Sequence, residues 1–147
     1  RYVGIDCSEE RIAYARQLNP DVQFEVADAC KALPEHIPKP QHAFCHGVLH
    51  HLSDEDSMAL LTGVSRIIQP NARFVAIEVS RPQIPWKHPL SYLGCVLDDG
   101  RHIRTLPAWR RLLGPYILEE DKIDLSPRWP VDIIAFHLNL GALSKIT

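Results

Sequence analysis

Carboxylates follow two short apolar segments near the start of the chain. Asp6 comes directly after the segment Tyr2–Ile5, and Asp28 follows Val22–Val26 after a single alanine. A carboxylate at the end of a strand can accept hydrogen bonds from the two vicinal hydroxyls of a ribose, or from an exocyclic amine such as N6 of adenine. The pair therefore indicates a nucleoside site, with capping of the following turn as the alternative role for either side chain.

Three histidines lie in or directly after a third apolar segment, Ala43–Leu49: His46 is within it, and His50 and His51 follow it. Histidine titrates near neutral pH, so one of them could serve as a general base. His46 and His50 have the i, i+4 spacing at which two imidazoles can share a metal ion on a helix, but they straddle a predicted strand end. No His-Glu-x-x-His pattern and no cysteine pair adds ligands. We predict no metal site and expect a polar pocket lining, with purely structural histidines as the alternative.

The segments around these residues alternate between apolar runs and helical patterns. We expect two helices, Ser8 to about Leu18 and Ser53 to Ile68, and four strands, at Tyr2–Ile5, Val22–Val26, Ala43–Leu49 and Arg73–Val79. This order predicts a parallel sheet with helices on both faces. In such a sheet ligands bind at the carboxyl ends of the strands, where the carboxylates and histidines above are found.

The second half of the chain has weaker patterns. The proline-rich stretch Arg81–Pro89 is predicted to be irregular, and Thr105 can cap a short helix. Tyr116–Leu125 and Val131–Leu140 are predicted to form an antiparallel hairpin at one edge of the sheet.

A locally basic stretch lies within Arg81–Arg111, with aromatic residues beside it. We expect Trp86 and Arg104 to contact a substrate. The alternatives are core packing for the aromatic residues and an ordinary solvated surface for the charges. Without a recognisable nucleic-acid-binding module, the basic residues do not predict nucleic-acid binding.

Four motifs, in order, resemble those of the class I S-adenosylmethionine-dependent methyltransferases of small-molecule type. The first three are Val3–Ser8, Val26–Ala29 and Gly47–Asp54, and Ile67–Val75 is similar to the next. The resemblance implies a Rossmann-like, three-layer α/β/α sandwich, with a mostly parallel sheet and an antiparallel C-terminal hairpin. It also implies transfer of a methyl group from S-adenosylmethionine to O, N or C of a small molecule.

The resemblance implies roles for individual residues. Asp6 would hold the ribose hydroxyls and Cys7 would pack beside the adenine. Asp28 would accept from adenine N6, and the backbone N–H of Ala29 would face a ring nitrogen. His46 would lie near the methionine part of the cofactor, and His50 and His51 near the transferring methyl group, as a base or for positioning.

The sequence departs from the family pattern at its start. The glycine-rich loop and its strand, which would precede Arg1, are absent, and Gln41 stands where an Asp is usual. The missing strand is central in the family, between Tyr2–Ile5 and Ala43–Leu49, so both segments would have exposed edges. We expect these two strands to pair with each other, to pair with another chain, as in a homodimer, or to belong to a piece of a longer protein.

Composition limits the remaining possibilities. The chain has 147 residues, 46% of them hydrophobic, and a net charge of −2. We expect one incomplete domain, 1–147, with a cofactor-binding core at 1–80, an acceptor-side excursion at 81–115 and C-terminal strands at 116–147. The four cysteines are scattered, and no segment is apolar enough for a signal or membrane span, so we expect a cytoplasmic protein. The alternative function is a catalytically inactive, methyltransferase-like binding module.

Overall fold

The computed structural model describes residues 2–31, 33–34, 36–69, 71–123 and 131–145. Its first unit is β1 (Val3–Asp6), α1 (Glu9–Leu18) and β2 (Gln23–Val26), in which the two strands pair in parallel. Ser8 caps α1 as predicted, because its hydroxyl accepts from the backbone N–H of Arg11 at 3.2 Å. The pairing register sets Asp6 opposite Val26, so the carboxyl ends of both strands lie together.

A mixed sheet of four strands forms the larger part of the molecule. The strands are β3 (His42–His46), β4 (Arg73–Ser80), β5 (Ile117–Ile123) and β6 (Asp132–Leu138), and their order is β3-β4-β6-β5. β3 and β4 are parallel, whereas β6 is antiparallel to both β4 and β5. The predicted C-terminal hairpin is thus confirmed, and positions 124–125 of its first strand lie outside the described residues.

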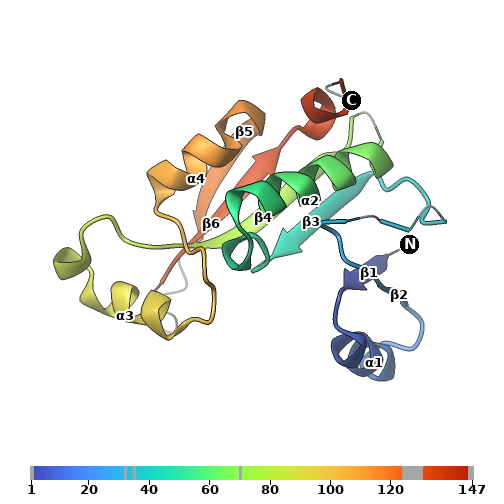
Figure 1. Cartoon of the computed structure of the whole chain (residues 1–147), viewed down its shortest axis with the longest axis horizontal. Coiled ribbons are helices and arrows are strands. Elements are labelled where there is room, and N and C mark those ends of the chain that lie inside the picture. Colours follow the sequence, from blue (N-terminus) through green and yellow to red (C-terminus); the bar gives the residue numbers. More distant parts are fainter. Residues whose placement is uncertain (1, 32, 35, 70, 124–130, 146–147) are drawn as a thin grey trace.

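Two helices, α2 (Asp54–Ile67) and α4 (Leu106–Leu113), cover one face of this sheet (Figure 1). Ser53 caps α2, since its hydroxyl accepts from the N–H of Asp56 at 3.0 Å. The strands alternate, so every second side chain of β4 and β6 points to these helices. The resulting core contains apolar residues that are almost fully buried: Leu49, Leu61, Phe74, Ala76, Trp109, Leu113, Phe136 and Leu138.

A helix that the sequence did not reveal, α3 (Pro89–Leu97), follows the irregular proline-rich stretch. Its sequence has no charged residue, so it has no polar face against which a helical period could be detected. Cys95 of α3 packs with Val131 and Ile133 in a second, smaller cluster. The helix lies at the opposite end of the molecule from α1 (Figure 1).

Bilayer-crossing helices are not found in the described parts of the chain: none combines the necessary length with the necessary apolar character.

The predicted strand Ala43–Leu49 is wrong at its end and in its burial. β3 stops at His46 because Gly47 adopts a φ of +64°, a left-handed conformation that glycine takes easily. Leu49–His51 then forms a short 3-10 turn. Phe44, expected to be buried, is 57% exposed because it lies on the face of β3 opposite Ala43 and Cys45, which pack against the core.

The edges of β1 and β3 face a pocket of about 500 Å³. Residues of both strands line it, among them Gly4 and Ile5 of β1 and Ala43 and Cys45 of β3. Among the described residues these strands do not pair with each other, so the first of the three expected alternatives, closure of the gap by their pairing, is wrong. The sheet is therefore divided into two parts at this position (Figure 1).

Candidate functional site

Asp6 and Asp28 lie at the ends of neighbouring parallel strands, and each has one oxygen engaged by the backbone. Oδ1 of Asp6 accepts from the N–H of Ser8 at 2.8 Å, and Oδ1 of Asp28 accepts from the N–H of Cys30 at 3.0 Å. Both side chains therefore stabilise a local turn, which was the alternative role. The backbone also joins the two strand ends, because the N–H of Ala27 donates to the carbonyl of Asp6 at 3.1 Å.

In the part of the chain that the structure describes, the ion-pair partner of the second oxygen of each carboxylate is a long, exposed cation. Oδ2 of Asp6 is 3.7 Å from Nη1 of Arg11, whose side chain is 77% exposed, and Oδ2 of Asp28 is 3.1 Å from Nζ of Lys31. The hydrogen bond from the N–H of Cys30, followed by that from Lys31, lowers the pKa of Asp28. Since neither cation is held by burial, a ligand with hydroxyl or amine donors can compete for these oxygens.

The three other predicted cofactor residues are divided between the two sheets. Cys7 is exposed beside Asp6, and Ala29 lines the pocket between the sheets. His46 is exposed at the last position of β3. The structure thus places Cys7 and Ala29 with the two carboxylates and His46 at the end of the separate, four-stranded sheet.

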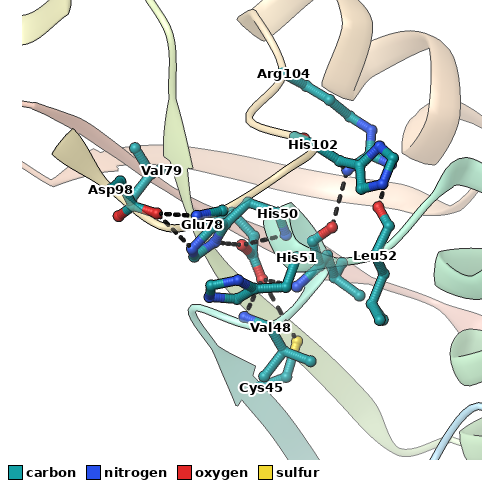
Figure 2. Close-up of polar contacts among 12 residues, drawn as sticks. Cys45, Val48, His50, His51, Leu52, Glu78, Val79, Asp98, His102 and Arg104 are labelled. Carbon is teal, nitrogen blue, oxygen red and sulfur yellow. Dashed lines mark hydrogen bonds and ion pairs between the residues drawn. The ribbon is translucent and has the colours of Figure 1, made fainter. Parts of the chain in front are cut away.

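Glu78 of β4 organises the turn that carries the histidines (Figure 2). Its carboxylate is fully buried, and Oε1 accepts from the N–H groups of Val48 and Leu49 at 3.1 and 2.8 Å. Oε2 accepts from the N–H of His50 at 3.2 Å and lies 2.8 Å from its Nδ1. Hydrogen bonds of this kind stabilise a buried carboxylate in place of water.

His50 lies between two carboxylates (Figure 2). Its Nδ1 contacts Glu78, and its Nε2 is 3.4 Å from Oδ1 of Asp98, in the loop after α3. Burial alone would lower the pKa of this imidazole, but the hydrogen bond and charge of Glu78, with Asp98 and Asp99, raise it above its ordinary value. Both ring nitrogens of His50 therefore face protein groups rather than a pocket.

His51 stacks beside His50, with the two ring centroids 4.2 Å apart. Its side chain is 41% exposed, and its Nε2 lies 3.9 Å from the exposed carboxylate of Asp99. Of the two predicted catalytic histidines, His51 alone is open to a bound molecule.

Arg104 is a structural residue, which corrects the expectation that it contacts a substrate. Its Nε and Nη2 donate to Asp54 at 2.8 and 2.7 Å. The remaining donors bond to the backbone carbonyls of Leu49, Leu52 and His102, and the guanidinium lies over the ring of Trp109. These bonds use all of its N–H groups, so none is left for a ligand.

A second pocket, of about 260 Å³, opens beyond the end of β4. Its lining includes the charged or titratable residues Arg81, Lys87, His88, Lys122 and Asp132. The last two form an ion pair with 2.6 Å between Nζ and Oδ1. Trp86, which is 80% exposed, is not among its lining residues.

Sequence reasoning gave no role to Glu78, Asp98 or Asp54. The only local signal for Glu78 is an acidic residue within the apolar strand Arg73–Ser80. Its partners come from another part of the chain, so their identity could not be read from spacing. The same holds for Asp98, which reaches His50 across a large separation in sequence.

Comparison with known proteins gives a consistent picture. Residues 1–71 match the family model described as a methyltransferase domain. Among solved structures, LepI in complex with SAM is 15% identical with a TM-score of 0.69, over 93% of this chain and 35% of LepI. The PH0226 protein of Pyrococcus horikoshii is 17% identical with a TM-score of 0.70, over 94% of this chain and 71% of that protein.

An SAM-dependent methyltransferase of Methanosarcina mazei is 16% identical with a TM-score of 0.69, and the match covers 92% of this chain and 80% of that one. No curated protein matches the sequence. The chain spans about a third of the length of LepI, and more of the other two proteins.

Proposed function

We propose that this chain binds S-adenosylmethionine and takes part in methyl transfer to a small molecule. Two findings support the proposal: residues 1–71 match a methyltransferase domain, and the chain resembles class I S-adenosylmethionine-dependent methyltransferases in its Rossmann-like fold. The observation that carries this proposal is the pair of carboxylates at adjoining strand ends. When bound, the cofactor supplies an electrophilic methyl group on a sulfonium.

Asp6 and Asp28 are proposed to hold the adenosine. Oδ2 of Asp6 is suited to the ribose hydroxyls, since Oδ1 is fixed by the N–H of Ser8 and orients the carboxylate. Oδ2 of Asp28 is suited to the adenine amine in the same way, with Oδ1 fixed by Cys30. Cys7 beside one carboxylate and Ala29 beside the other complete the adenosine site. His46 is proposed to lie toward the methionine part.

The acceptor is proposed to be a small molecule at the carboxyl end of β4. The pocket there has a volume of about 260 Å³, just below the range of about 300–1,000 Å³ usual for ligand pockets, which supports a small acceptor. Its lining by Arg81 and Lys87 favours an acceptor that carries a negative charge. Trp86 lies outside the lining residues, so its contact with an acceptor is proposed only at the rim.

His51 is not among the lining residues of this pocket, and it is proposed as the base or positioning residue for the part of an acceptor that extends beyond it. His50 is less suited, because Glu78 and Asp98 already face its two nitrogens. Methyl transfer from a sulfonium depends chiefly on the alignment of nucleophile and methyl group, so a positioning role is sufficient. If His51 is a base, the His51→Gln variant should lose a pH dependence of the rate that the wild type shows. If His51 only positions the acceptor, the two pH–rate profiles should have the same shape.

Binding of S-adenosylhomocysteine, measured by calorimetry, tests the proposed cofactor site. Asp6→Asn and Asp28→Asn keep the Oδ1 acceptor of each turn but remove the charge, and each should weaken binding about tenfold, or 1.4 kcal/mol. Asp21→Asn, an exposed carboxylate at the opposite end of β2, is the matched control and should bind as the wild type does. If all three variants bound S-adenosylhomocysteine with the affinity of the wild type, the adenosine site would be refuted.

A binding module without catalytic activity is the second candidate. It is favoured by the division of the sheet, because β1 and β3 present separate edges to the pocket between them. This candidate predicts no methyl transfer by the chain, with or without cofactor binding. Turnover of the bound cofactor in the presence of an acceptor would exclude it.

A further inference from the structure

Three side chains next to the buried Glu78 offer ligand atoms to one point. A ring nitrogen from each of His50 and His51 and a carboxylate oxygen of Asp98 all lie within 4.8 Å of one another. We propose that these three residues bind a divalent transition-metal ion, Zn²⁺ in the first place. The proposal goes beyond methyl transfer and does not depend on it.

The distance between His50 and Asp98 favours a metal over a direct hydrogen bond. Nε2 of His50 is 3.4 Å from Oδ1 of Asp98, which is longer than the usual range for a nitrogen–oxygen hydrogen bond. Two ligands of a tetrahedral zinc ion, each about 2.0–2.1 Å from the metal, are separated by about 3.3 Å. The ring of His51 would have to shift to bring its nitrogen to the same point, and its side chain, 41% exposed, has room to do so.

The residues behind the ligands form the outer shell that such sites require. A metal-bound histidine almost always donates its other ring N–H to a carboxylate or carbonyl. Nδ1 of His50 lies 2.8 Å from Oε2 of the buried Glu78, so Nε2 is the nitrogen left for a metal. Oδ1 of Asp98 accepts from the N–H of Gly100 at 2.7 Å, which fixes the direction of that carboxylate as well.

The sequence did not predict a metal, because His46 and His50, at i and i+4, straddle a predicted strand end and no His-Glu-x-x-His pattern or cysteine pair adds ligands. The structure supplies the third ligand from the loop after α3, at Asp98. Three protein ligands with one position open to water are typical of catalytic rather than structural zinc sites. His51 cannot be a base and a metal ligand at once, so a bound metal excludes its proposed role at the acceptor.

The competing explanation is a protonated imidazole held between two carboxylates. In that case Nε2 of His50 carries a proton that Asp98 attracts, and no metal is needed. Metal binding displaces this proton, because the ligand nitrogen must be unprotonated. The two explanations therefore differ in their response to added metal.

Titration of the metal-free chain with Zn²⁺, followed by calorimetry, and with Co²⁺, followed by its d–d absorption, tests the site. The expected result is one ion per chain. His51→Ala and Asp98→Asn should each weaken binding more than about tenfold, since a lost ligand costs at least as much as a lost outer-shell partner. Both residues lie near the surface, and unchanged circular dichroism would show that the variants fold.

His137 and Asp121 give the matched control, because they form a comparable pair on the C-terminal hairpin, with 3.2 Å between Nε2 and Oδ2. His137→Ala and Asp121→Asn should leave metal affinity unchanged. No binding to the wild type, or equal binding by all four variants, would overturn the proposal. A thiolate charge-transfer band with Co²⁺ would also overturn it, because the metal would then be on cysteines.

Discussion

One oxygen of Glu78 is within hydrogen-bond distance of both the backbone and the ring of His50. Oε2 of Glu78 accepts from the backbone N–H of His50 at 3.2 Å and lies 2.8 Å from Nδ1. The other oxygen accepts from the two preceding N–H groups, so one carboxylate holds the whole turn. The position of the histidines is thus set by β4, a strand to which they do not belong.

Glu78→Gln should destabilise the fold strongly. An amide has one acceptor oxygen, so its NH₂ group would face backbone N–H donors in a buried site, at a cost of about 3 kcal/mol. Urea unfolding measures this loss. Glu119→Gln, an exposed position on β5, is the control and should change stability by less than about 0.5 kcal/mol. Equal midpoints for both variants would mean that Glu78 does not hold the turn.

Gly100→Ala should destabilise the chain, whereas Gly114→Ala should not. A Cβ at position 100 would come within 2.3 Å of Cδ2 of His50, and relief of this clash costs about 1–3 kcal/mol. Gly114 has helical dihedral angles and open space around it, so alanine there should stabilise by about 0.4–1 kcal/mol. Thermal unfolding of the two variants should therefore shift in opposite directions. A shared direction would contradict the close packing at Gly100.

Acid should remove the contribution of the pair Arg110–Glu120. The hydrogen bond from Arg110, followed by its charge, lowers the pKa of Glu120 below the ordinary value of 4.5. A lowered pKa in the folded state means that the stabilisation is complete above 4.5 and is lost as the pH falls through the lowered value.

The free energy of unfolding of Glu120→Gln should therefore lie below that of the wild type at pH 7 and meet it in acid. Chemical denaturation at a series of pH values gives both curves. The difference should be small, since the pair is partly exposed. A gap that widens as the pH falls would have the wrong sign.

The cysteines should differ in reactivity. Burial, followed by the charge of Glu78, raises the pKa of Cys45 well above its usual value, so little thiolate forms near pH 8. Cys7 is exposed and should be alkylated first by iodoacetamide. Mass spectrometry of peptides at successive times measures the order. Labelling of Cys45 as fast as Cys7 would contradict the raised pKa of Cys45.

Local patterns predicted much of the fold. Ser8 and Ser53 start helices because a hydroxyl at the N-cap accepts a backbone N–H, an interaction within a few residues. The alternation of apolar runs gave the parallel pairs and the hairpin. In contrast, α3 was missed because it lacks a polar face, and β3 was extended too far because the conformation of Gly47 depends on its surroundings.

Much of the candidate site depends on contacts that sequence spacing does not encode. Asp6, Asp28 and His51 could be chosen as candidates from the sequence because the ends of apolar segments are recognisable. Arg104 was misassigned, because its partners Asp54 and Leu49 come from a distant segment. The gap beside β1 could be anticipated only from a family resemblance, and whether the strands would close it was decided by packing.

The central claim is that an adenosine is held at the adjoining ends of β1 and β2. An amide-resolved NMR titration of the ¹⁵N-labelled chain with S-adenosylhomocysteine tests it most directly. The largest shifts are expected at the backbone amides of Cys7, Ser8, Ala29 and Cys30, with Glu119 and Lys122 on the distant hairpin unchanged. Saturable shifts confined to other parts of the chain, or none at all at high ligand concentration, would contradict the claim.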